Sequence, residues 1–210
     1  ETNDLRIVDL GDLIGGKDLR DTLYALADLL VYLHNYHLFT ILLGGSGIFN
    51  LGIIQALQQQ KAHLTFTMVE PFFSLPEHEA YRMIDFDRLD YYNIAGQFYY
   101  LDQKSRDWLQ HYRYKAYRVG QLRNNSRESE PVLRASDGCS ISVNAIKHAD
   151  APGQQGAHPN GLYGEEICQI ARYAGISDQL QWMAVFDYFP EHDLHATTAS
   201  LIAQIVWFAI

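Results

Sequence analysis

Residues Leu38-Phe39-Thr40-Ile41-Leu42-Leu43-Gly44-Gly45-Ser46-Gly47 decide how the rest of this sequence is interpreted. The first six form a short apolar run whose length and whose β-branched and aromatic content favour a buried strand over a helix. The run ends at two glycines, where the backbone is free to turn. An amphipathic pattern over 18–36 predicts a helix before the strand, and a second helix is expected over about 50–60.

The same alternation of strands and helices continues along the chain. Further strands are expected over 63–69, 139–143 and 183–189, with a short one at 99–101. Further helices are expected over 102–112, 164–174 and 197–208, and loops over 123–131 and 149–163. Strands separated by helices form parallel sheets that are covered on both faces. The sequence therefore predicts an α/β domain with three layers, α/β/α, around a mainly parallel sheet.

Composition and charge limit the classes of partner. The chain has 210 residues, of which 48% are hydrophobic, which suits one globular domain over 1–210. The formal net charge is −9, whereas nucleic-acid binding needs a basic surface, so no nucleic-acid partner is expected. No window holds about 18 consecutive apolar residues, so no membrane span is expected.

The two cysteines, Cys139 and Cys168, are too few for a disulfide framework in a chain of this length. Each is expected to pack as a small core hydrophobe. Unpaired cysteines fit a reducing compartment, so the expected location is the cytoplasm.

Three further stretches carry a resemblance to a known family. They are 142–153 (SVNAIKHADAPG), 160–166 (NGLYGEE) and 171–175 (ARYAG). Together with the turn after Leu43, they have the order and spacing of the arginase, agmatinase and formimidoylglutamase superfamily, and the chain resembles its formimidoylglutamase-like branch from about 9 to 208. The resemblance implies an arginase-like fold. It also implies that the N-terminal part of the full fold is missing, because family members usually begin with an earlier strand.

The family's metal site provides a test of function. Family members bind two manganese ions that share a hydroxide, through carboxylates and imidazoles at several strand ends. Glycine and phenylalanine side chains cannot bind a metal, and neutral serine and asparagine oxygens cannot balance two divalent charges. We therefore expect no manganese cofactor and no ureohydrolase activity. The six positions that match the family's ligands here hold Gly47, Glu70, Phe72, Ser74, Ser142 and Asn144.

Two further acidic residues match family positions near the substrate. The resemblance places Glu166 opposite the amidine end of a substrate, and Asp187 near the same site. Residue chemistry alone offers other roles, because Glu166 suits the start of a helix and Asp187 suits a structural hydrogen-bond acceptor. These two residues are the candidate binding residues for a small cationic or amidine ligand.

Other sites are weaker candidates. The clusters at His148–Asp150 and His192–His195 lie in expected loops, where solvated histidines are the more common outcome. The glycine-rich turn lacks the Gly-x-Ser-x-Gly spacing of a nucleophile elbow, although a phosphate at the following helix start stays open.

Three functional hypotheses follow. The first is a pseudoenzyme of arginase-like fold with a role in binding or assembly, either as a homo-oligomer or with an active homologue. The alternative is an active amidine hydrolase, acting on formiminoglutamate or a guanidino compound, whose metal site is rebuilt from Glu70, Asp187, Glu166 and loop histidines. A subunit that supports an active homologue is the third.

Overall fold

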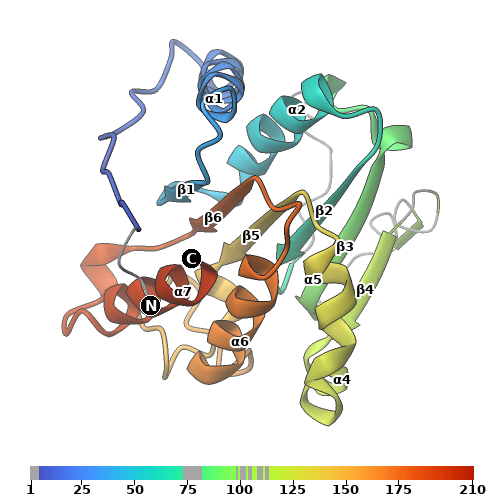
Figure 1. Cartoon of the computed structure of the whole chain (residues 1–210). Helices are drawn as coiled ribbons and strands as arrows, with labels where there is room; N and C mark the ends of the chain where they lie inside the picture. Colours follow the sequence, from blue (N-terminus) through green and yellow to red (C-terminus); the bar gives the residue numbers. More distant parts are fainter. Residues whose placement is uncertain are drawn as a thin grey trace.

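The computed structural model of the chain describes residues 5–72, 82–97, 99, 103, 106, 107, 111 and 114–210. Within these residues six strands form one sheet in which every neighbouring pair is parallel. The order across the sheet is β1-β6-β5-β2-β3-β4 (Figure 1). The strands are β1 (Thr40–Leu43), β2 (Leu64–Val69), β3 (Leu89–Gly96), β4 (Tyr114–Arg118), β5 (Gly138–Ser142) and β6 (Trp182–Phe186).

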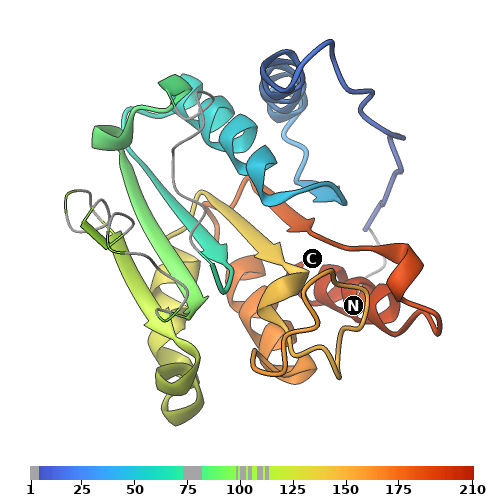
Figure 2. The same ribbon diagram turned by 180° about the vertical axis from the view of Figure 1, so that it is seen from behind.

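Helices cover both faces of the sheet, as the two opposite views show (Figures 1 and 2). One face carries α1 (Leu19–His34) and α2 (Asn50–Gln60). The other face carries α4 (Val119–Asn124), α5 (Glu130–Arg134), α6 (Gly164–Gly175) and α7 (Thr197–Ala209). This arrangement confirms the expected three-layer α/β/α fold.

Strand β6 shows why the sheet is apolar on both faces. Side chains alternate along a strand, so Trp182, Ala184 and Phe186 pack with α1 and α2, while Met183 and Val185 pack with α6 and α7. All five are buried. The sequence of a strand that is covered on both faces is a continuous apolar run, which is why β6 could be identified from the sequence.

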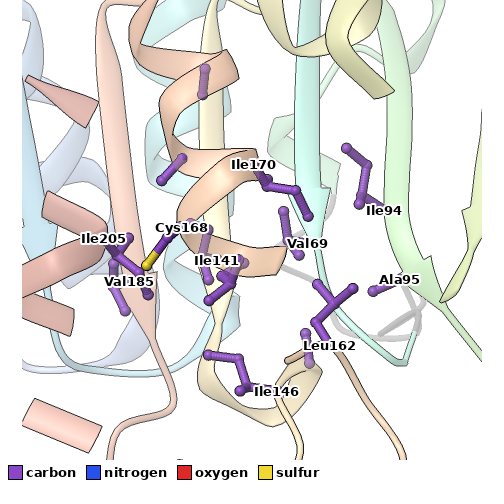
Figure 3. Close-up of a cluster of buried hydrophobic side chains, with 14 of the residues drawn as sticks. Val69, Ile94, Ala95, Ile141, Ile146, Leu162, Cys168, Ile170, Val185 and Ile205 are labelled. Carbon is purple, nitrogen blue, oxygen red and sulfur yellow. The ribbon is translucent and has the colours of Figure 1, made fainter. Parts of the chain in front are cut away.

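The core between the sheet and α6 is shown in Figure 3, where Val69, Ile141 and Val185 of the strands meet Ile170 of α6 and Ile205 of α7. Both cysteines are buried and unpaired, as expected from the sequence. Burial raises the pKa of the Cys139 thiol to about 12, so this side chain is neutral at physiological pH.

Several boundaries differ from those expected. The sequence did not predict β3 or β4, which mix polar and apolar residues irregularly and become strands by pairing, β3 with β2 and β4 with β3. The expected loop at 123–131 is largely helical, because it contains the end of α4, a 3₁₀ turn and the start of α5. The last expected strand ends at Phe186 rather than at 189. The expected strand at 99–101 and helix over 102–112 fall largely outside the described residues.

No helix in the described ranges has both the length and the apolar character needed to cross a membrane.

Candidate functional site

The carboxyl ends of β1, β5 and β6 meet at Asp187, the residue that follows β6. One of its oxygens, Oδ2, accepts a hydrogen bond of 2.6 Å from Ser142 Oγ at the end of β5. The other, Oδ1, accepts one of 3.3 Å from the backbone N–H of Gly47, in the turn after β1. Three positions far apart in the sequence are therefore held together by one carboxylate, as expected where parallel strands end at a common edge.

The backbone of Asp187 is in the left-handed region, with φ of 63°. This conformation costs a non-glycine residue about 1–2 kcal/mol. The N–H of Asp187 donates a 2.8 Å hydrogen bond to the carbonyl of Gly45, which has φ of 80°. This bond and the two side-chain bonds of Asp187 offset the strain and fix the direction of the carboxylate.

Two asparagines adjoin this cluster, and the Oδ1 of each is buried without a partner among the described residues. Ser142 Oγ accepts a 3.2 Å bond from the N–H of Asn144, whose own Oδ1 is buried and has no protein partner among the described residues. The Oδ1 of Asn50, a residue that is only 3% exposed, is unpartnered in the same part of the chain. A Cβ placed on Gly47 would lie 3.9 Å from Asp187 Oδ2 and 4.0 Å from Asn50 Nδ2. Asp187 and Asn50 therefore flank the position where a side chain is missing.

Glu70, directly after β2, is the second carboxyl group of the site. The Tyr91 hydroxyl donates a 2.8 Å hydrogen bond to Glu70 Oε1. Burial raises the pKa of Glu70 to about 8, the Tyr91 bond opposes that rise, and the negative charge of Asp187 adds to it. The raised pKa favours the neutral, protonated form of Glu70 at neutral pH.

Two of the expected metal positions do not join this cluster in the described structure. The ring of Phe72 packs edge-on against the ring of His158, with 5.0 Å between their centroids. Ser74 lies outside the described residues. An aromatic ring therefore occupies the position where the family resemblance implies an imidazole ligand.

Glu166 lies in the first turn of α6, apart from Asp187. Its Oε2 accepts a 2.8 Å hydrogen bond from the N–H of Tyr163, and its Oε1 accepts one of 3.3 Å from Arg123 Nε. The guanidinium of Arg123 also lies 4.5 Å from the centre of the Tyr163 ring. These contacts are those of a carboxylate that caps a helix start, the role that residue chemistry alone suggested.

In the histidine clusters, His148 Nδ1 is buried without a partner among the described residues, and the other contacts are to a loop and to helix starts. His192 Nδ1 lies 3.0 Å from the carbonyl oxygen of Gln154. The neighbouring Asp193 accepts hydrogen bonds from the N–H groups of Thr198 and Ala199 at the start of α7. Asp150 accepts a 2.9 Å bond from the N–H of Gly164 at the start of α6. These acidic side chains support helix starts and do not converge with the histidines.

The side chains present do not fit a pair of divalent ions. No group of three or more His, Cys, Asp and Glu side chains in the described ranges is arranged to hold a metal ion. Around Asp187 the described neighbours are a glycine, a serine hydroxyl and two asparagines, none of which is charged. Two divalent cations need several anionic or imidazole ligands, which this set lacks.

Sequence reasoning therefore found Gly47, Ser142, Asn144 and Asp187 as neighbours and missed Asn50 and Tyr91. Asn50 is the first residue of α2 and is buried, although asparagine is usually an exposed residue. Its position three residues after Gly47 was the only sequence signal for it. Tyr91 lies in β3, which was not expected, so its contact with Glu70 could not be inferred.

Comparison with known proteins finds similarity in structure. The sequence matches no protein-family model and no curated protein. Formiminoglutamase from Trypanosoma cruzi superposes with a TM-score of 0.85 at 14% identity, over 100% of this chain and 75% of that one. Formimidoylglutamase from Bacillus subtilis gives a TM-score of 0.82 at 15% identity, over 96% of this chain and 70% of that one. Arginase from Bacillus subtilis gives a TM-score of 0.82 at 15% identity, over 96% of this chain and 83% of that one.

At such low identities the likeness concerns the fold, and it confirms the architecture that the sequence motifs implied. This chain has the fold of the arginases and formimidoylglutamases.

Proposed function

We propose that this chain is an arginase-fold protein without amidine hydrolase activity, which binds a small cationic or amidine ligand at the carboxyl ends of its strands. The observation that carries the proposal is the set of groups around Asp187. A Trypanosoma cruzi formiminoglutamase with the same fold has been solved with Mn²⁺. Here a glycine, a serine and an asparagine occupy three of the matching ligand positions, and none of them supplies a negative charge.

The chemistry of the site favours a single positive charge over two divalent ions. Asp187 supplies a carboxylate, and the adjoining Asn50 and Asn144 each have a buried Oδ1 without a partner among the described residues. Buried acceptors without partners are unfavourable unless a donor reaches them. A planar amidinium or guanidinium group carries one charge and several N–H donors, so it complements one carboxylate and two amides.

Metal content and turnover test the first half of the proposal. Purified protein is incubated with manganese, desalted, analysed for bound metal, and assayed with formiminoglutamate, arginine and agmatine. We expect no stoichiometric metal and no turnover above the buffer control. Stoichiometric manganese together with turnover would overturn the proposal in favour of an active hydrolase with a rebuilt site.

Calorimetric titration with agmatine tests the second half and separates the two candidate carboxylates. Asp187→Asn removes the charge beside Asn50 and should weaken binding at least about tenfold, since loss of a charged hydrogen bond costs about 1.5–3 kcal/mol. Glu166→Gln makes the same charge change in the first turn of α6 and should leave binding unchanged. The reverse result would place the ligand at Glu166.

An assembly role is the other form of the same hypothesis. If no ligand binds and the protein co-purifies from its native host with an active homologue, the binding proposal fails and a supporting subunit takes its place. We also propose a cytoplasmic location, which the two unpaired cysteines support.

A further inference from the structure

The two residues that follow Asp187 fix the loop after β6. The Tyr188 hydroxyl donates a 3.1 Å hydrogen bond to Asp193 Oδ2. The N–H of Phe189 donates one of 2.9 Å to the carbonyl of Gly153. Both bonds come directly after the left-handed backbone of Asp187. The chain is therefore tied down just beyond Asp187 as well as at its own N–H group.

Asp193 connects Tyr188 to the start of α7. It is only 7% exposed, and its carboxylate also accepts hydrogen bonds of 3.1 Å from the N–H of Thr198 and 2.9 Å from the N–H of Ala199. These two N–H groups lie in the first turn of the helix, where donors have no partner within the helix itself. The group that holds Tyr188 is thus fixed to α7, whose apolar face packs in the core.

Gly153 lets the Tyr188 ring come close to this helix start. A Cβ on Gly153 would lie 2.7 Å from Tyr188 Cε2 and 3.0 Å from Thr198 Oγ1, so any side chain there would displace the ring. The N–H of Gly153 donates a 2.7 Å hydrogen bond to the hydroxyl of Thr198, which is buried. We call the unit formed by Gly153, Tyr188, Asp193 and Thr198 the Tyr188 latch.

The latch opposes the relaxation of Asp187. A left-handed backbone is unfavourable for a residue other than glycine, and it persists where the surrounding structure determines it. A loop released from α7 would let Asp187 return to negative φ, which would turn its carboxylate away from Ser142 and Gly47. Because Tyr188 follows Asp187 in the chain, the latch acts on this carboxylate through the backbone.

We propose that Tyr188 is a positioning residue, whose hydroxyl, bonded to Asp193, keeps the Asp187 carboxylate in the orientation that binds the ligand. The inference rests on the proposed ligand site at Asp187 and explains how that site keeps its shape. Tyr188→Phe separates the two parts of the side chain, since it removes the hydroxyl and keeps the ring against Gly153.

Calorimetric titration with agmatine tests the proposal. Tyr188→Phe should weaken binding by about three- to tenfold, as expected for the loss of one hydrogen bond that acts on the site. Tyr173→Phe is the matched control, because it removes a tyrosine hydroxyl that accepts a bond from Gln169 within α6, and it should leave binding unchanged. In an Asp187→Asn background, Tyr188→Phe should cause little further loss, since a positioning residue acts only through the group that it positions.

Hydrogen exchange measures the latch without a ligand. The amide of Asp187, which donates to the carbonyl of Gly45, should exchange faster in Tyr188→Phe than in wild type. The amide of Gly44, which donates to the carbonyl of Val185 in the same turn, should keep its wild-type rate.

The outcomes separate this inference from the proposed function. If wild type binds agmatine and Tyr188→Phe binds it equally well, the positioning role is overturned and the ligand site stands. Additive losses from Tyr188→Phe and Asp187→Asn would overturn it too. If wild type binds no agmatine, the proposed function fails, and the exchange rate of the Asp187 amide decides the latch. A faster rate in Tyr188→Phe then supports the latch, and an equal rate overturns it.

Discussion

At the residue scale, the protonated Glu70 gives the protein a specific pH dependence. Its pKa rises from 4.5 to about 8 on folding, so between these values the unfolded chain releases a proton that the folded chain keeps. The free energy of unfolding should therefore decrease as pH rises from 4.5 to about 8, and then level off. We expect a decrease on the order of 2 kcal/mol, less than the full shift of the pKa would give, because part of the side chain still contacts water.

Glu70→Gln isolates this effect. The variant cannot lose a proton, so its urea-unfolding free energy should lack the decrease over that pH window and should exceed that of wild type above it. Asp178→Asn, at an exposed residue in the turn after α6, is the matched control. An unchanged pH profile in Glu70→Gln would show that Glu70 is ionised in the folded protein.

Two glycines of one turn should respond in opposite ways to alanine. Gly47 has ordinary backbone angles and room for a Cβ. Gly47→Ala should therefore stabilise the protein by about 0.5 kcal/mol, because alanine lowers the conformational entropy of the unfolded chain. Gly45 has φ of 80°, and a Cβ there would lie 2.9 Å from the Phe49 ring, so Gly45→Ala should destabilise by about 1–3 kcal/mol. Thermal unfolding of both variants checks this, and equal shifts would contradict the described turn.

At the element scale, the start of α6 depends on Glu166. Its carboxylate accepts the N–H of Tyr163, which is one of the unsatisfied donors of a helix start. Glu166→Ala should lower the free energy of unfolding by about 1 kcal/mol, measured by urea unfolding. Glu165→Ala removes an exposed neighbour with the same charge and should have an effect near zero. If the two variants lose equal free energy of unfolding, the negative charge of the first turn stabilises the helix start, and the hydrogen bond from Tyr163 does not.

The elements that the sequence identified share one physical property. Strand β6 is buried on both faces and all five of its residues are apolar, and α6 has a regular apolar stripe. Strand β3 carries Asp90 and Asn93 between apolar residues, and the outer strand β4 contains Lys115 and Arg118. Such strands are stabilised by pairing with their neighbours, and a pattern along one stretch of sequence does not record those neighbours.

At the scale of the whole molecule, the parallel sheet determines what the sequence could predict about the site. Residues that follow strands lie at one edge of such a sheet. The family resemblance had placed Gly47, Ser142 and Asn144 at matching ligand positions and Asp187 near the same site. Their hydrogen bonds were not predictable, since they depend on the left-handed backbone of Asp187 and on the order of the strands. The raised pKa of Glu70 depends on its burial, which only the folded structure shows.

The central claim is that the groups around Asp187 do not hold two divalent ions. Crystals grown with excess manganese and measured at the manganese absorption edge test this claim most directly. We expect no pair of anomalous peaks within bonding distance of Asp187, Glu70 and Asn144. Two strong peaks that share Asp187 as a ligand would contradict the account.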